Sequence, residues 1–205
     1  MSGIDWVWCP TEVTFRESFS VHDPEFGKKP HEYMSPLWVM DFVLPEQDLD
    51  KRRDIERAVS KSAGLIPFNV YDPRTPYPNY YIGVAGKNAP TSLIPPLYVK
   101  AVSKAGTITV SGADGDFITH GDPIAFTHEG WRYYFKAQDD LWLDGTDQVL
   151  PVFIRPRKNL TGLNILTDRI KPTCRFNVFI NDVVGPTKGR YSEFSLRGVE
   201  HWGVL

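Results

Sequence analysis

Prolines and glycines interrupt this chain along its whole length, and their spacing constrains the fold more than any other sequence feature. The 205 residues include 17 prolines and 16 glycines. Between these breakers lie short runs rich in Trp, Tyr and Phe, which favour strands over helices. A chain of this length can bury a core without disulfides or metals. The sequence therefore predicts a mainly β protein.

One helix is predicted, at 46–63. Pro45 suits its first turn, acidic residues follow, and Gly64 suits the C-terminal cap. Its apolar side chains form only a narrow stripe, made of Leu49, Ile55, Val59 and Ala63. We expect such a helix to lie on a sheet with most of its charge in water.

The clearest predicted strand is 37–44, which is apolar on both faces except at Asp41. A strand of this kind suits a sheet covered by a second layer or by a neighbouring subunit. The turn and breaker residues of 20–36 predict a loop. The prolines of 65–82 predict a long ordered loop around short strands near 68–71 and 80–82.

The sequence pattern changes at about residue 97, beyond which short predicted strands recur at close spacing. They are expected at 97–102, 107–110, 124–127, 132–137 and 149–154, with a hairpin around Gly130. Two final strands are expected at 174–180 and 191–199.

Two domains are therefore predicted. Residues 97–165 should form a small inserted β-barrel. Residues 1–96 and 166–205 should form a β-sandwich or split-barrel core that carries the helix.

Composition excludes several classes of function. The net charge of −2 gives no pull toward nucleic acid or anionic lipid. No apolar run reaches the roughly 18 residues of a membrane span. Cys9 and Cys174 lie far apart and without a CxxC partner, so we expect buried free thiols. The N-terminus has no leader pattern, so we expect synthesis in a cytoplasm.

Each candidate chemical site in the sequence has an ordinary structural explanation. His120 and Asp122 precede a strand that should hold His128 roughly 13 Å away, too far for a shared metal ion. Acid pairs such as Asp139-Asp140 are ordinary loop residues, and Asp114-Gly115-Asp116 predicts a tight turn rather than a calcium loop. We therefore predict no enzyme activity, and no catalytic, cofactor-binding or metal-binding residues.

Two segments carry a family resemblance. In the first, a strand with Trp38 ends at Pro45 and leads into the helix; Gly64, Phe68 and a proline-rich loop follow. In the second, Gly121-Asp122 begins a hairpin, and a strand before Pro156-Arg157 closes the segment. In this order the elements resemble those of the distal or minor tail proteins of siphophages, across roughly residues 37–157.

The resemblance implies a structural protein of the virion, assembled in the host cytoplasm. A distal tail protein forms a homo-oligomeric ring, usually of six copies, that joins the tail tube protein to the hub and tip proteins. It also implies a β-sandwich or split-barrel core with a helix and an inserted or appended small β-domain.

The loop 64–78 is predicted to be a docking element, because prolines fix its backbone before a partner arrives. The predicted interface residues are Trp38, Phe68, Tyr71 and Arg74. The alternative function is a carbohydrate- or receptor-binding β-domain. Its candidate residues are Trp131, Tyr133 and Trp142, for which core packing is the competing explanation.

Overall fold

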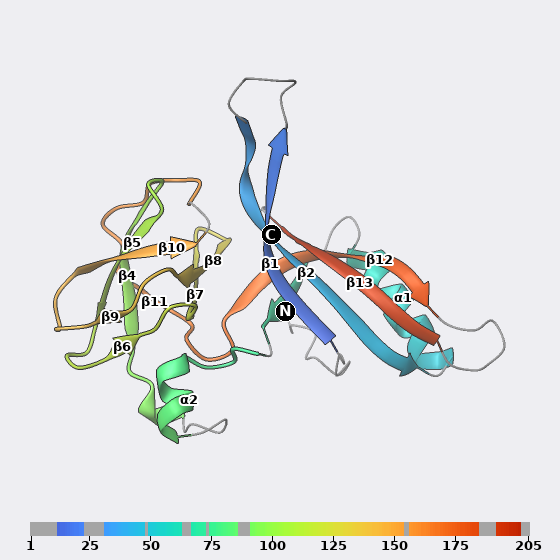
Figure 1. Cartoon of the computed structure of the whole chain (residues 1–205), viewed down its shortest axis with the longest axis horizontal. Helices are drawn as coiled ribbons and strands as arrows, with labels where there is room; N and C mark the ends of the chain where they lie inside the picture. The colour runs from blue at the N-terminus through green and yellow to red at the C-terminus, as the bar shows by residue number, and fades with distance from the viewer. Residues whose placement is uncertain are drawn as a thin grey trace. The chain divides into compact units, whose positions relative to one another are not determined.

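A computed structural model describes 12–22, 31–47, 49–62, 67–72, 74–85, 91–153, 156–184 and 192–201. Figure 1 shows its strands and helices. The protein is mainly β, as predicted, with antiparallel sheets and a β-sandwich-like core. None of the sheets closes into a barrel, so the small barrel expected from the sequence is an open sheet instead.

The described residues group into two compact units. The first takes in 12–18, 37–70 and 175–201, and the second takes in 71–174 with the outer parts of the first two strands. The second unit thus begins before 97 and ends after 165. That residues 97–165 form a domain of their own stays a prediction.

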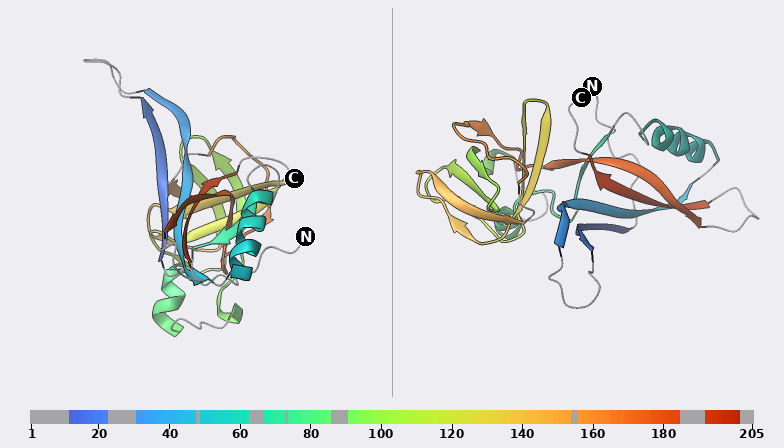
Figure 2. Two further views of the ribbon diagram at one scale, coloured as in Figure 1. Left: turned by 90° about the vertical axis from the view of Figure 1, so that its right-hand side faces the viewer. Right: turned by 90° about the horizontal axis from the view of Figure 1, so that it is seen from above.

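A five-stranded sheet forms the first unit, in the order β1-β2-β13-β12-β3. Its strands are β1 (Glu12–His22), β2 (His31–Gln47), β3 (Phe68–Tyr71), β12 (Thr173–Val184) and β13 (Ser192–Glu200). The two final strands predicted from the sequence are therefore present in this sheet. Helix α1 (Leu49–Ser62) lies over one face of β12 and β13, as Figures 1 and 2 both show.

Strand β2 is covered on both faces at residues 38–40. Trp38, Val39 and Met40 are consecutive and all buried, and neighbouring residues of a strand point to opposite faces. Ile55 and Val59 of α1 are buried as well. Packing within one subunit thus explains the apolar residues 38–40 of the strand and the Ile55 and Val59 part of the helix stripe.

Two predictions near β2 are wrong. The expected loop 20–36 is strand over its described parts, because β1 and β2 extend through both of its ends. The helix begins at Leu49 rather than 46, because β2 continues past Pro45. Pairing with β13 is irregular there: Gln47 faces Ser192 and Leu44 faces Phe194. Such a bulge accommodates a proline, which has no N–H for the ladder.

A six-stranded sheet forms most of the second unit, in the order β11-β4-β5-β10-β8-β7. Its strands are β4 (Leu97–Ser103), β5 (Thr107–Gly112), β7 (Pro123–His128), β8 (Trp131–Ala137), β10 (Gln148–Phe153) and β11 (Ile165–Leu166). A smaller pair joins β6 (Phe117–Ile118) to β9 (Leu141–Trp142). All five strands expected between 97 and 154 are found.

The predicted hairpin is formed by β7 and β8. His128 pairs with Trp131 across a two-residue turn. Glu129 and Gly130 both have positive φ, at 50° and 80°, which is the backbone of a type I′ turn. Strand β7 of this hairpin is an edge strand of the sheet. Asp168 forms a bridge with its Ala125, so the segment after β11 protects that edge.

The strand expected at 80–82 is a helix, α2 (Asn79–Ala85). A short 3-10 helix, η1 (Thr91–Leu93), follows it. The Pro78 carbonyl accepts the N–H of Ile82 at 3.3 Å, as expected of a residue that precedes a helix. Asp122 accepts the N–H of Asn79 at 2.8 Å. The aromatic residues of this segment predicted a strand. The Asp122 carboxylate, from a turn distant in sequence, caps the first turn and so accounts for the helix.

Candidate binding site

Three aromatic side chains of the second unit gather at its surface: Tyr80, Phe117 and Trp142, named here the aromatic cluster. Trp142 is 59% exposed, and Tyr80 and Phe117 are partly exposed. Phe117 and Trp142 face each other across the β6–β9 pair, with ring centroids 4.3 Å apart. Tyr80 meets both rings edge-on, at 5.5 and 6.1 Å. Helix α2 and the β6–β9 pair thus form one apolar surface together.

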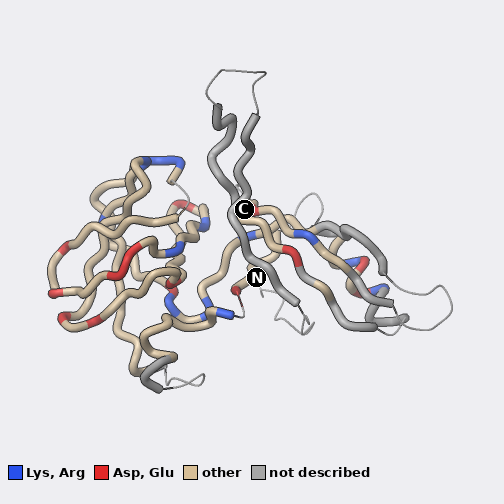
Figure 3. Tube along the Cα trace, viewed as in Figure 1, with Lys and Arg blue, Asp and Glu red and all other residues tan. Residues whose placement is uncertain are grey.

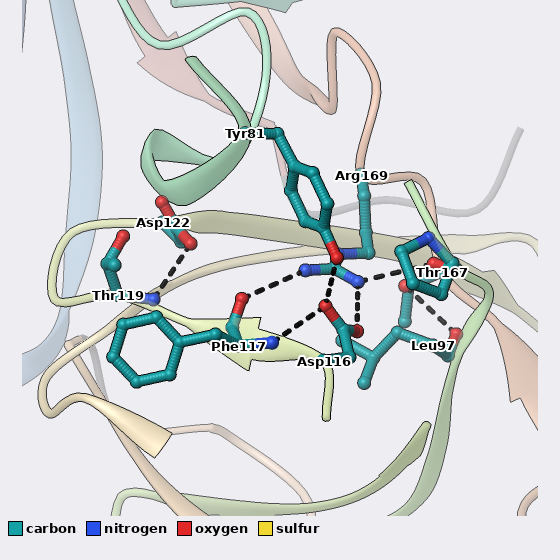
Figure 4. A network of polar contacts seen from close by, with 9 residues as sticks. Tyr81, Leu97, Asp116, Phe117, Thr119, Asp122, Thr167 and Arg169 are labelled. Carbon is teal, nitrogen blue, oxygen red and sulfur yellow. Dashed lines mark hydrogen bonds and ion pairs between the residues drawn. The ribbon is translucent and has the colours of Figure 1, made fainter. Parts of the chain in front are cut away.

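A buried ion pair lies beside this cluster (Figure 4). The carboxylate of Asp116, a residue only 2% exposed, lies 2.5 Å from the buried guanidinium of Arg169. It also accepts the Tyr81 hydroxyl at 2.6 Å and the N–H of Phe117 at 2.8 Å. Arg169 donates further to the carbonyls of Pro95 and Phe117. Each partner therefore has hydrogen bonds beyond the ion pair, which limits the cost of burying two charges.

The turn that presents Asp116 has the conformation its sequence predicts. Gly115 has a φ of 79°, which glycine adopts without strain. The Asp116 N–H donates to Ala113, and the Asp116 carbonyl accepts the Leu143 N–H at 2.8 Å. The loop from β5 is thereby fastened to the segment that follows Trp142.

Asp122 is a second buried carboxylate near α2. It accepts the N–H groups of Asn79 and Thr119, at 2.8 and 2.9 Å. Burial raises the pKa of Asp122, which these two bonds oppose. Burial, together with the hydrogen bond to Asp116, also raises the pKa of the Tyr81 hydroxyl. That hydroxyl is therefore a donor at physiological pH.

The histidines of this region stay apart from any metal-binding arrangement. His120 contacts the Gln138 carbonyl through Nδ1 at 2.6 Å, and His128 lies beside Glu129 at the hairpin turn. Within the described residues, no group of three His, Cys, Asp or Glu side chains is placed to hold a metal ion.

A third buried carboxylate, Asp72, has two cations. It receives two hydrogen bonds from the Arg74 guanidinium, at 2.8 and 2.9 Å, and one from Lys136 at 3.2 Å. Burial alone would raise the pKa of Asp72, but the Arg74 hydrogen bond and the Lys136 charge lower it overall. Asp72 and Arg74 thus pair within one chain.

The predicted interface residues lie in different surroundings. Trp38 and Phe68 are buried in the first unit, which leaves little of either for a partner. Tyr71 is partly exposed, with the Lys171 ammonium 5.5 Å from its ring. The Arg74 side chain is 51% exposed. The role of these four residues at an interface stays a prediction.

The three aromatic residues considered for sugar binding also differ. Tyr133 is buried and stacks on Phe126 at 4.9 Å. Trp131 is partly buried, with the Lys158 ammonium 5.2 Å from its ring. Trp142 is well exposed. Sequence analysis missed Tyr80 and Phe117, because only the β6–β9 pairing and the unexpected helix bring them beside Trp142.

Comparisons with known proteins assign this chain to no family. No protein-family model matches the chain, and no curated protein matches it. Over the ranges that the structure describes, no helix is long and apolar enough to cross a membrane.

Proposed function

We propose that this protein is a structural subunit of a tailed-phage tail tip, a ring-forming adaptor that joins the tail tube to the hub and tip proteins. The proposal places the chain in the virion, in a homo-oligomeric ring that is assembled in the host cytoplasm. The family resemblance implies six copies in the ring. It assigns no catalytic activity and no cofactor.

The observation that carries the proposal is the insertion of one β unit into another. Strands β3 and β12 are neighbours in the first sheet, and most of the second unit, 71–174, occupies the chain between them. A sheet with a covering helix and an inserted β-domain is the organisation expected from the resemblance. The order β2, α1, β3 and a proline-containing turn also follows the pattern that carries the resemblance.

Charge and surface features support an assembly role. The net charge of −2 would not retain DNA that passes through a ring. Tyr71 and Arg74 lie at the end of β3 and leave part of their surface exposed. A closed ring requires two different patches that fit head to tail, and these residues are our candidates for one of them.

Assembly state tests the proposal. Native mass spectrometry and electron microscopy of the purified chain, alone and with tail tube and hub proteins, should show a closed ring. Arg74→Ala should weaken the ring while the subunit stays folded, because Lys136 still pairs with Asp72. Arg57→Ala is the matched control, since Arg57 pairs with Asp54 on the exposed face of α1.

Two results would count against the proposal or its interface. One is a chain that stays monomeric under all of these conditions, which would overturn the ring-forming adaptor. The other is equal ring formation by Arg74→Ala and the unmodified protein, which would remove Arg74 from the interface.

A further inference from the structure

The aromatic cluster is distinctive among the exposed apolar side chains. Within the described residues, the other large apolar side chains that are well exposed are all aliphatic: Leu93, Val149, Leu166 and Ile170. Among the described residues of this exposed group, Trp142 is the only aromatic one. The ring of Phe117 packs against it. Exposed single aliphatic residues are common on protein surfaces, whereas a group of aromatic rings marks a site of contact.

The cluster is held in place by buried polar groups. Tyr80 precedes Tyr81, whose hydroxyl donates to Asp116, and Phe117 follows Asp116 directly. Arg169 pairs with the other oxygen of the same carboxylate. Because the residues next to two of the three rings belong to one hydrogen-bonded network, the rings lose little conformational freedom on binding a ligand.

The loops around the cluster are acidic. Five aspartates with exposed side chains flank the β6–β9 pair in sequence: Asp114, Asp139, Asp140, Asp144 and Asp147. Figure 3 shows acidic positions along these loops. The Asp114 and Asp144 loops adjoin, since Gly115 donates to the Leu143 carbonyl at 2.9 Å. Such a surface repels phosphate, which argues against single-stranded nucleic acid as the ligand of the aromatic rings.

Carboxylates also provide acceptors for hydroxyl groups. Hydrogen bonds from the Thr146 hydroxyl and N–H lower the pKa of Asp144, so it is ionised at neutral pH. A neutral ligand with an apolar face and several hydroxyl donors matches both parts of this surface. A pyranose sugar has this chemistry, because its C–H groups stack on an aromatic face while its hydroxyls donate to carboxylates.

We propose that Tyr80, Phe117 and Trp142 form a binding platform for a neutral saccharide, with Asp114 and Asp144 accepting hydrogen bonds from its hydroxyls. This activity goes beyond the adaptor role and belongs to the second unit alone.

An array of immobilised neutral oligosaccharides of glucose, galactose, mannose and N-acetylglucosamine tests the proposal with the full chain. The strongest binder is then titrated by calorimetry. Trp142→Ala should weaken its affinity roughly tenfold or more, the loss expected for one stacking ring. Trp131→Ala is the matched control, an aromatic deletion on the β7–β8 hairpin outside the cluster, and should leave the affinity unchanged.

Asp144→Asn separates the hydrogen-bonding part from stacking, and a smaller loss of affinity is expected. Thermal unfolding of Trp142→Ala should match that of the unmodified protein, because the side chain is mostly in solvent. Native mass spectrometry of the same variant should show the same assembly, so loss of sugar binding and failure of the adaptor proposal give different results.

Several outcomes would overturn the saccharide platform. They are the absence of any array signal, equal affinity of Trp142→Ala and the unmodified protein, and binding of a single-stranded oligonucleotide or a polylysine peptide in preference to every sugar. The polylysine result would identify the acidic loops as a site for a cationic partner.

Discussion

The two units of this protein bury different kinds of side chain. The described core of the first unit is almost entirely apolar, with Glu200 as its buried acid, and that carboxylate accepts the N–H of Trp38 at 3.1 Å. The second unit buries Asp72, Asp116, Asp122 and Arg169. Apolar contacts are non-directional, whereas buried ion pairs and capped turns specify position. Buried polar contacts therefore fix surface side chains of the second unit, whereas apolar packing dominates the described core of the first.

Removing the charge of Asp116 should break the second unit most severely. Asp116→Asn leaves Arg169 buried without a counter-charge, and the expected loss is roughly 3–5 kcal/mol of unfolding free energy. Urea denaturation measures this loss, and hydrogen exchange should show the largest effect in β4 and β5 rather than in β12 and β13.

The double variant Asp116→Asn/Arg169→Met is the control for charge. It should recover much of the lost stability, because no uncompensated charge remains. If the single variant is as stable as the unmodified protein, the ion pair does not hold the second unit in place.

Shortening an apolar side chain should affect the first unit instead. Phe68→Ala should cost about 3 kcal/mol, at the lower end for a phenylalanine, because Phe68 is 8% exposed. The same denaturation and exchange measurements apply, and the protection of β12 and β13 should fall most. Loss of protection confined to the second unit would contradict the apolar account of the first.

Arg74→Ala should have a smaller effect, about 1 kcal/mol, because half of the Arg74 side chain is in solvent and Lys136 remains. The Arg74→Ala substitution should also alter how the stability of the protein depends on pH. The folded pKa of Asp72 lies below its ordinary value of 3.8, so its contribution is present above that value and lost as pH falls through the lowered pKa.

Without Arg74, burial raises the pKa of Asp72 relative to the unmodified protein. The acid loss of stability should therefore begin at higher pH in the variant, as urea denaturation across a pH series can measure. Identical acid profiles for the two proteins would show that Arg74 does not set the Asp72 pKa.

The smallest expected effect concerns the hairpin turn. Glu129 has a positive φ of 50° and a mostly exposed side chain, and asparagine tolerates this conformation better. Glu129→Asn should raise stability by about 0.5 kcal/mol, measured as a small increase in the urea midpoint. Glu129→Val should lower it, because a β-branched residue resists positive φ.

Much of the strand pattern could be predicted from local sequence. Gly106, Gly121 and Gly130 have positive φ and mark the turns between strands that the sequence already indicated. The strand at 31–36 was missed, because its residues resemble a loop and only pairing in the sheet orders them. Helix α2 was missed because Tyr80, Tyr81 and Ile82 favour a strand, while a distant carboxylate caps the helix.

The candidate site was less accessible to sequence reasoning. Asp116 and Arg169 are 53 positions apart, and nothing in the local sequence pairs them. Trp142 was a candidate from its residue type alone. Its neighbours Phe117 and Tyr80 come from elements whose pairing the sequence did not reveal.

The chain leaves the first sheet after β3 and returns to it at β12, and the two connecting segments touch, since the Lys171 N–H donates to the Pro76 carbonyl at 2.6 Å. Recombination at these two segments would therefore add, remove or exchange most of the second unit. A short turn of about two to five residues is enough to rejoin such ends. Such an exchange would give the protein a different surface while leaving the chain segments of the first sheet as they are.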